Sequence, residues 1–343
     1  MVSPKELVKQ TLAFNHTGRI PRHMWTLPWT EMHHPGELKR INGRFPDDIT
    51  WCPVELNEPP PTTGDPYTIG TYIDEWGCVF INRQRGVIGE VKEPLVKTWD
   101  DLKRVRPPIG NLSVDIAQIN AFCQNTDLFV LSSAATRPFE RLQFLRGTEE
   151  LFVDLALKSV ELHSLIDRVH QFFLKELEIW ARTDVDALFF QDDWGSQNNL
   201  LISPKTWREI FKPLYKEYID LAHQHGKYAF MHSDGNIEKI YPDLIELGLD
   251  AVNSQLFCMN IEELGQKYGG QITFWGEIDR QHTLPFGSLE EVEHAVRRVN
   301  EHLYHNGGVI AQCSFGVGVK PANVEQVFKT WEELHRKNEN DIS

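Results

Sequence analysis

Short apolar runs alternate with longer amphipathic segments throughout the second half of the chain. In each longer segment apolar residues recur every three or four positions, which is typical of a helix that buries one face. The apolar runs span residues 186–191, 228–232, 250–254, 272–276 and 307–313. Strands that alternate with helices at this spacing predict a parallel sheet with right-handed crossover connections.

The predicted helices carry end signals that agree with this pattern. Ser203 can cap a helix that follows the first run, Pro204 suits its first turn, and Gly226 can end it. Ser288 and Glu291 form a capping-box pattern at the start of a later helix. The alternation therefore reflects strands and helices rather than composition alone.

Two further apolar runs, residues 127–133 and 22–27, extend the pattern toward the N-terminus. They bring the predicted strands to seven, and an eighth would close a (β/α)8 TIM barrel. No further run identifies that eighth strand, so a doubly wound open sheet stays as the alternative. The barrel is favoured because no GxGxxG turn follows the first strand.

Residues 41–108 break the alternation, because they are rich in Pro, Gly and Asp. Within them, residues 72–95 predict a β-hairpin around Arg85 and Gly86. We interpret residues 41–108 as an insertion over one end of the barrel. Residues 1–343 are then a single α/β domain.

Composition and charge narrow the class of protein. The chain is 41% hydrophobic and 24% charged, with a net charge of −14 and no long basic block, which argues against binding to nucleic acid or to an anionic membrane. Its five cysteines are widely spaced and form no CxxC pair, which favours a reducing compartment over a disulfide framework. The N-terminus has no apolar signal region and no run of 18 apolar residues occurs. We therefore expect a cytoplasmic protein.

Polar or ionisable residues end every predicted strand of the second half. In a barrel these strand ends surround the mouth of the active site. The residues are Gln191, Asp192, Asp193, His232, Asp234, Asn253, Gln255, Glu277, Asp279 and Cys313. We predict Asp193 and Glu277 as proton-transfer residues. We predict substrate contacts from Trp25, Asp192, Gln255 and Asp279. Asp192 and Asp193 could equally cap the backbone of the following loop.

His232, Asp234 and Cys313 form the most specific subset. Imidazole, carboxylate and thiolate are ligand types of zinc, and three protein ligands with an open position are typical of a catalytic zinc site. The alternative is structural, because Asp234, Gly235 and Asn236 also form a common turn sequence, and a free Cys is often a small core residue.

Four arginines are candidates for binding substrate carboxylates, with surface ion pairs as the alternative. These residues are Arg19, Arg22, Arg137 and Arg141.

Several segments together resemble the uroporphyrinogen decarboxylase superfamily. They are "FFQDDWGSQNNLLISPKTWREIFKPLYKEYIDLAHQHGK", "MHSDGNIEKIYPDLIELGLDAVN", "FWGEIDRQHTLPFGSLEEV" and "GGVIAQCSFGVGVKPANV". The segment "YIDEWGCVF" is similar to the methyltransferase-like branch of that superfamily. The resemblance extends over most of the chain from about Arg19 and implies a (β/α)8 barrel with its site at the C-terminal mouth.

The superfamily contains two chemistries, and the sequence departs from the first. Decarboxylases of tetrapyrrole acids carry an arginine-rich motif after the first strand, whereas the matching segment "MWTLPWTEMHHPGE" has no arginine. Their last strand ends in a GHG-type segment, and its histidine position is Cys313 here. Decarboxylation by this chain would need other arginines to bind the substrate.

The second chemistry belongs to zinc-dependent methyltransferases that work with corrinoid proteins. The resemblance places His232 and Cys313 on two of their zinc ligands, and Asp234 where a cysteine would stand. A carboxylate in place of a thiolate makes a harder, more Lewis-acidic zinc site, which suits a leaving oxygen better than a substrate thiol.

The resemblance therefore implies removal of a methyl group from an O-methyl small molecule and its transfer to a separate corrinoid (cobalamin) protein. Decarboxylation of a tetrapyrrole acid, and a non-enzymatic ligand-binding barrel, are the alternatives. A homodimer is compatible with the superfamily.

Overall fold

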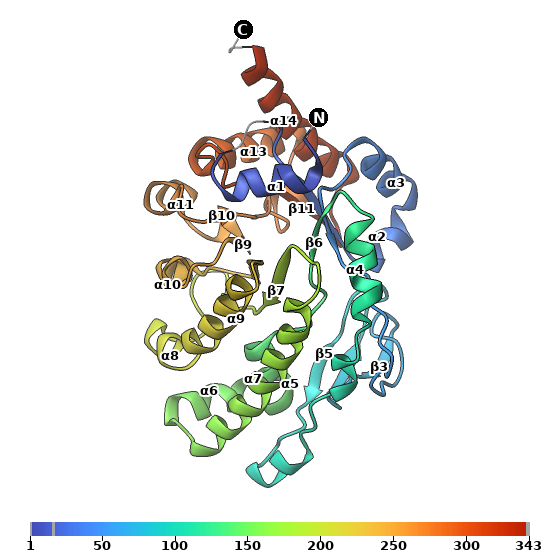
Figure 1. Cartoon of the computed structure of the whole chain (residues 1–343), viewed down its shortest axis with the longest axis vertical. Coiled ribbons are helices and arrows are strands. Elements are labelled where there is room, and N and C mark those ends of the chain that lie inside the picture. The colour runs from blue at the N-terminus through green and yellow to red at the C-terminus, as the bar shows by residue number, and fades with distance from the viewer. Residues whose placement is uncertain (1, 16–17, 341–343) are drawn as a thin grey trace.

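Eight parallel strands close into a barrel in the computed structural model, which describes residues 2–15 and 18–340 (Figure 1). The barrel strands are β1 (Arg22–Thr26), β2 (Ile49–Trp51), β6 (Phe129–Leu131), β7 (Ala187–Gln191), β8 (Tyr228–Ser233), β9 (Ala251–Ser254), β10 (Thr273–Phe274) and β11 (Ala311–Phe315). Six of them form one sheet in the order β10-β9-β8-β7-β6-β2, and β1 pairs with β11. Parallel bridges such as Glu277 to Gln312 join β10 to β11, and a bond from Asp48 N to Arg22 O joins β2 to β1.

The predicted barrel is thus confirmed, and the open-sheet alternative is wrong. All seven predicted strands belong to the barrel wall. The eighth is β2, which lies within residues 41–108, so the predicted insertion begins too early. With three residues between polar and proline-containing segments, β2 is too short to show a periodic pattern.

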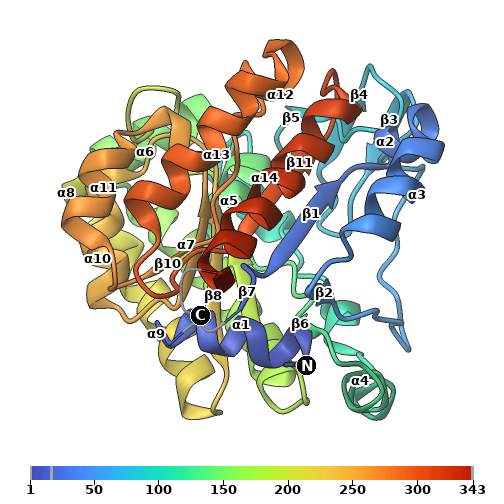
Figure 2. The same cartoon turned by 90° about the horizontal axis from the view of Figure 1, so that it is seen from above.

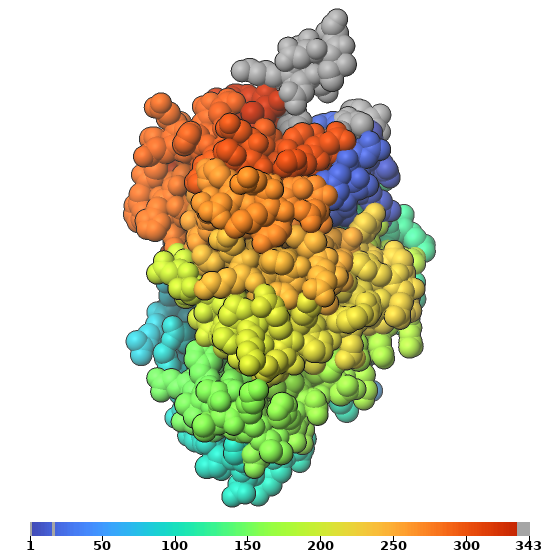
Figure 3. Space-filling model, turned by 90° about the vertical axis from the view of Figure 1, so that its left-hand side faces the viewer, coloured from blue at the N-terminus to red at the C-terminus, as the bar shows by residue number. Residues whose placement is uncertain are grey.

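Helices cover the outside of the barrel. They are α1 (Pro4–Leu12), α2 (Pro28–His33), α3 (Pro35–Arg44), α4 (Ile116–Gln124), α5 (Pro138–Arg146), α6 (Thr148–Leu157), α7 (Val160–Ala181), α8 (Pro204–Ile210), α9 (Lys212–Gln224), α10 (Tyr241–Glu246), α11 (Ile261–Tyr268), α12 (Thr283–Phe286), α13 (Leu289–Leu303) and α14 (Pro321–Asn340). Short 3₁₀ helices are η1 (Trp99–Arg104), η2 (Ile109–Leu112), η3 (Glu238–Ile240) and η4 (Leu256–Cys258). Figure 3 shows one outer face, on which successive parts of the chain lie side by side in sequence order. No helix within the described ranges has both the length and the apolarity to cross a bilayer.

The predicted helix ends are confirmed, but one of the predicted helices is interrupted. Ser203 accepts a hydrogen bond from Thr206 N at 3.0 Å, and Ser288 forms the expected capping box with Glu291. The helix predicted from Ser203 to Gly226 is divided into α8 and α9, and Pro213 lies in the first turn of α9. Proline has no N–H to donate and disfavours continuation of a preceding helix, which explains the break.

A three-stranded antiparallel sheet stands over the C-terminal end of the barrel. It consists of β3 (Gly70–Ile73), β4 (Val79–Asn82) and β5 (Glu90–Glu93), and Arg85 and Gly86 lie in the turn between β4 and β5 as predicted. Gly86 O accepts a hydrogen bond from Trp29 N at the start of α2, directly after β1. Figure 2 shows this sheet at the end of the barrel opposite α1.

The side chains of the barrel strands alternate between two core layers. The inner layer is strongly aromatic and includes Phe189, Phe230 and Trp275, with Trp25 and Trp51 packed against it. Val8 and Leu12 of α1 join this layer and close the N-terminal end of the barrel. The outer layer packs the other face of each strand against the helices. The face of the strand on which a residue lies therefore decides whether its side chain can reach the mouth.

Candidate active site

His232 lies on the inner face of β8, and its neighbours fix the direction of its ring. Its Nδ1 is 2.6 Å from Oδ1 of Asn253, whose Nδ2 donates to the carbonyl of Trp275. Because the amide nitrogen of Asn253 is committed to a carbonyl, its oxygen must face the histidine and accept. In neutral His232 the hydrogen therefore sits on Nδ1, and the lone pair of Nε2 points into the barrel mouth.

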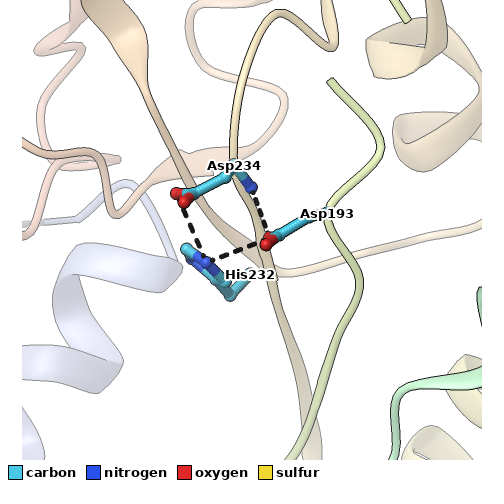
Figure 4. A group of neighbouring side chains, drawn as sticks. All are labelled: Asp193, His232 and Asp234. Atoms are coloured by element: carbon cyan, nitrogen blue, oxygen red, sulfur yellow. Dashed lines mark hydrogen bonds and ion pairs between the residues drawn. The ribbon is translucent and has the colours of Figure 1, made fainter. Parts of the chain in front are cut away.

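Two carboxylates converge on that nitrogen (Figure 4). Nε2 of His232 is 3.5 Å from Oδ1 of Asp193 and 3.5 Å from Oδ1 of Asp234. One potential ligand atom from each of the three residues lies within 4.8 Å of the others. Among the described residues, Oδ1 of Asp234 has no hydrogen-bond partner although it is buried. A buried carboxylate oxygen beside a lone pair and a second carboxylate is unfavourable unless a cation or a proton stands between them.

The loops after β7 and β8 hold Asp193 and Asp234 together. Asp234 N donates to Oδ1 of Asp193 at 3.0 Å, and Gly195 N donates to Asp234 O at 3.0 Å. Gly235 has a positive φ of 78°, and a Cβ on it would lie 2.1 Å from Gly195 O. Only glycine therefore permits this close approach of the two loops.

Cys313 does not join the cluster, so its prediction as a third metal ligand is wrong. On β11, Gln312 and Ser314 face inward, whereas Cys313 packs in the outer layer with Met24 of β1 beside it. Burial, with a smaller effect of the Glu277 carboxylate, raises the pKa of the Cys313 thiol. The third potential ligand atom comes instead from Asp193, which was predicted as a proton-transfer residue.

Asp192 also points away from the mouth, and its predicted substrate contact is wrong. It accepts hydrogen bonds from Phe139 N at 2.9 Å and Glu140 N at 2.8 Å, at the N-terminus of α5, and from the hydroxyl of Tyr215 in α9. Burial raises the pKa of this carboxyl well above its usual range. Asp192 thus joins β7 to two helices. The side chain of its neighbour Asp193 points the opposite way, toward His232.

Gln255 and Asp279 both accept hydrogen bonds from backbone N–H groups. Oε1 of Gln255 accepts from Gly235 N at 3.0 Å, which supports the turn that carries Asp234. Asp279 accepts from Gln281 N at 2.9 Å and Thr283 N at 3.2 Å, and so caps α12. Both residues also line a small cavity with Glu277 and Arg280, so their role as substrate contacts stays a prediction.

Glu277 lies at the mouth as predicted, between a hydroxyl and a guanidinium. Its Oε2 accepts from Ser314 Oγ at 2.9 Å, and its Oε1 is 3.2 Å from Nε of Arg280. Burial raises the pKa of Glu277 to about 7, although Arg280 opposes the shift. Near neutral pH the side chain can therefore either give or take a proton.

Arg280 is a residue that the strand-end pattern missed. It bridges Glu277 to Asp234 by pairing with one carboxylate through Nε and with the other through Nη2. Its position three residues after Glu277, beyond the end of a strand, was the available signal.

Trp25 reaches the site from β1, at the place where a substrate contact was predicted. Its ring centroid is 5.1 Å from that of His232. Its Nε1 donates to Nδ1 of His23 at 3.2 Å, and burial lowers the pKa of His23 to about 3, which keeps that nitrogen an acceptor.

The four candidate arginines occupy different places. Arg19 pairs with Asp48 at the N-terminal end of the barrel, and Arg22 is buried there. Arg141 is buried against Asp74 and Glu75 of the antiparallel sheet. Arg137 lines a cleft of about 1010 Å³ between that sheet and the barrel mouth, together with Glu140 and Asp193.

Comparison with known proteins agrees with this architecture. Residues 67–334 match the family model described as uroporphyrinogen decarboxylase (URO-D). A solved methyltransferase from Methanosarcina mazei is similar, with a TM-score of 0.65 and 14% identity over 97% of this chain and 99% of that chain. A B12-independent methionine synthase from Shewanella sp. W3-18-1 has a TM-score of 0.45 and 12% identity over 93% of this chain and 96% of that chain. No curated protein sequence matches. At 14% identity the likeness to the Methanosarcina mazei structure concerns the fold alone.

Proposed function

The chain belongs to the uroporphyrinogen decarboxylase family, and we propose that it is a methyltransferase that removes a methyl group from an O-methyl compound and passes it to a corrinoid carried by a separate protein. The observation that supports this most is the cluster of Asp193, His232 and Asp234. It combines a directed imidazole nitrogen with a buried carboxylate oxygen that lacks a partner among the described residues.

We propose that Asp193, His232 and Asp234 hold a zinc ion. An imidazole nitrogen and carboxylate oxygens are ligand types that zinc accepts, and three protein ligands leave a position open at the barrel mouth. When bound, such an ion supplies the Lewis acidity that stabilises negative charge on a leaving oxygen. Arg280 keeps Oδ2 of Asp234 occupied, so that Oδ1 is the oxygen directed at His232.

Glu277 would supply the proton that the leaving oxygen takes up. Its carboxyl is held by Ser314 and Arg280, and a pKa of about 7 leaves a useful fraction protonated at neutral pH. In the overall reaction the bond between the methyl carbon and the oxygen breaks, and its electron pair stays on the oxygen, which accepts the proton. The methyl carbon bonds to the cobalt of the corrinoid substrate, and the cobalt is oxidised from Co(I) to Co(III).

Decarboxylation of a tetrapyrrole acid has less support from the arginine positions. Arg19 and Arg22 lie at the N-terminal end of the barrel, away from the mouth, and Arg141 is committed to Asp74 and Glu75. Of the four candidates this leaves Arg137, which lines the cleft at the mouth, whereas a substrate with several carboxylates would need a set of guanidinium groups near one another.

Elemental analysis of protein purified without chelator tests the metal site. We expect a stoichiometric divalent metal in the native protein and in Cys313→Ala, and its loss in His232→Ala. Mixing the protein with cob(I)alamin and a panel of methyl ethers tests the transfer, which appears as a change in the corrin absorption. Equal metal content in all three proteins, with no spectral change across the panel, would refute the proposal.

A further inference from the structure

A hollow of about 290 Å³ lies beside the cluster, between the ends of β1 and β11. Its walls are mainly apolar and include Trp25, Leu27, Phe315, Val317 and Val319, with Arg280 on one side; we call it the Trp25 pocket. Two of these lining residues contact the cluster of Asp193, His232 and Asp234 directly. The Trp25 ring packs near His232, and Arg280 pairs with Asp234. A ligand in this pocket would therefore have one end next to the three clustered side chains.

The charge of the pocket restricts what it can hold. Arg280 is the charged residue among its lining side chains, and its Nε and Nη2 face Glu277 and Asp234. The other lining groups offer a serine hydroxyl and the backbone as polar partners. Because this guanidinium is already paired with two carboxylates, a charged ligand would find no free partner of opposite charge within the apolar walls, and burying it there would be costly. A neutral ligand avoids this cost.

The volume of the pocket and the aromatic ring of Trp25 restrict the size and chemical type of the ligand further. A volume of 290 Å³ corresponds to roughly ten water molecules at about 30 Å³ each. That space admits one substituted ring but not a tetrapyrrole. Trp25 lines it, and an aromatic side chain favours an aromatic partner in stacked or edge contacts.

We propose that the Trp25 pocket binds the methyl donor, and that this donor is a neutral single-ring methyl aryl ether. The assignment of the ligand as methyl donor rests on the proposed methyltransferase function. The pocket then accounts for substrate choice: it accepts methoxy-substituted rings and rejects methylated ammonium compounds.

A matched pair of probes isolates the effect of charge. The compounds 1-tert-butyl-4-methoxybenzene and (4-methoxyphenyl)trimethylammonium have nearly the same shape and differ by one positive charge. We expect calorimetry or saturation-transfer NMR to show at least tenfold tighter binding of the neutral compound. Equal or tighter binding of the cation would overturn the proposal.

Filling the pocket tests its location. Val317 is 45% exposed, so Val317→Trp should fold while its indole occupies part of the pocket. Val153→Trp places the same side chain on α6, where Val153 is 50% exposed, and serves as the control. We expect at least a tenfold loss of affinity for 2-methoxyphenol in Val317→Trp and no change in Val153→Trp. Unchanged affinity in Val317→Trp would place the binding elsewhere and refute the assignment.

Binding and transfer are measured separately, so the two proposals can fail independently. If methyl aryl ethers bind in the pocket but donate no methyl group to cob(I)alamin, the pocket assignment stands and the methyltransferase function fails. If the protein demethylates methylated amines and binds no aryl ether, the methyltransferase function stands and the pocket assignment fails.

Discussion

Replacing Gly235 by alanine tests how the two ligand-bearing loops are held together. A Cβ at this position would lie 2.1 Å from O and 2.2 Å from C of Gly195, both backbone atoms that cannot rotate away. The φ of 78° adds strain, because side-chain-bearing residues rarely adopt it. The loops after β7 and β8 must therefore separate.

The expected loss of stability follows from the contacts that are broken when the two loops separate. Three hydrogen bonds join the loops: Asp234 N to Asp193 Oδ1, Gly195 N to Asp234 O, and Asn236 N to Ser196 O. At about 1 kcal/mol each, their loss costs about 3 kcal/mol, and the left-handed conformation adds about 1 to 2 kcal/mol. We expect Gly235→Ala to lower the free energy of unfolding by about 4 to 5 kcal/mol, from the sum of these two effects.

Gly226→Ala is the matched control, because Gly226 also has a positive φ, of 66°, but no atom lies within 4 Å of its added Cβ. It should cost only the strain of about 1 to 2 kcal/mol. Urea denaturation gives both stabilities, and competition with a chromophoric chelator gives the zinc affinity. We expect Gly235→Ala to bind zinc at least tenfold more weakly and Gly226→Ala to bind it normally. If the two variants were equally stable and bound zinc equally, the loop contact would not position the cluster.

Three further predictions concern buried carboxyl groups. Burial raises the pKa of Glu176 to about 8, so the contribution of this group to stability should be fully present below its unfolded pKa and fall by about 4 to 5 kcal/mol as pH rises to 8. Glu176→Gln should remove this contribution to the pH dependence of thermal melts, and an unchanged slope would contradict it. Glu277, with a pKa of about 7, should make the methyl-transfer rate decline above pH 7; Glu277→Gln should lower the rate on the order of a hundredfold and remove that decline, as measured by a pH–rate profile. Asp192→Asn should leave a buried N–H of α5 unpaired and lower the free energy of unfolding by about 2 kcal/mol while the metal content stays unchanged.

The barrel was predictable because its strands are apolar on both faces. Runs such as Ala187–Gln191 and Tyr228–Ser233 pack against the inner aromatic layer and the outer helical layer at once, so they stand out from the amphipathic helices. The three-residue strand β2 gives no such signal, and its place in the wall is fixed by pairing with β6. Such tertiary pairing leaves no mark in the local sequence.

The candidate site was predictable only in part, because the sequence shows where a strand ends but not which face each residue takes. His232 and Asp234 were correctly brought together, and Asp193 was placed at the same mouth. The neighbouring pair Asp192 and Asp193 gave the same signal in the sequence, yet one contacts the outer helices and the other the cluster. A shift of one residue in register exchanges the two roles.

The alternation of side chains between the two faces of a strand also explains why Cys313 of the last strand is not a ligand and Asp193 of a loop takes its place. A side chain from β11 could reach the inner face only from position 312 or 314, since Cys313 packs between Phe315 and Ala311 on the outer face. Both inward positions serve Glu277: Gln312 donates to Ser314, and Ser314 donates to the carboxylate. The residues that complete the cluster must therefore follow the strands, where the backbone is free of the sheet's alternation. Asp193 and Asp234 do so, and the contact between Gly195 and Gly235 brings their carboxylates to the imidazole of His232.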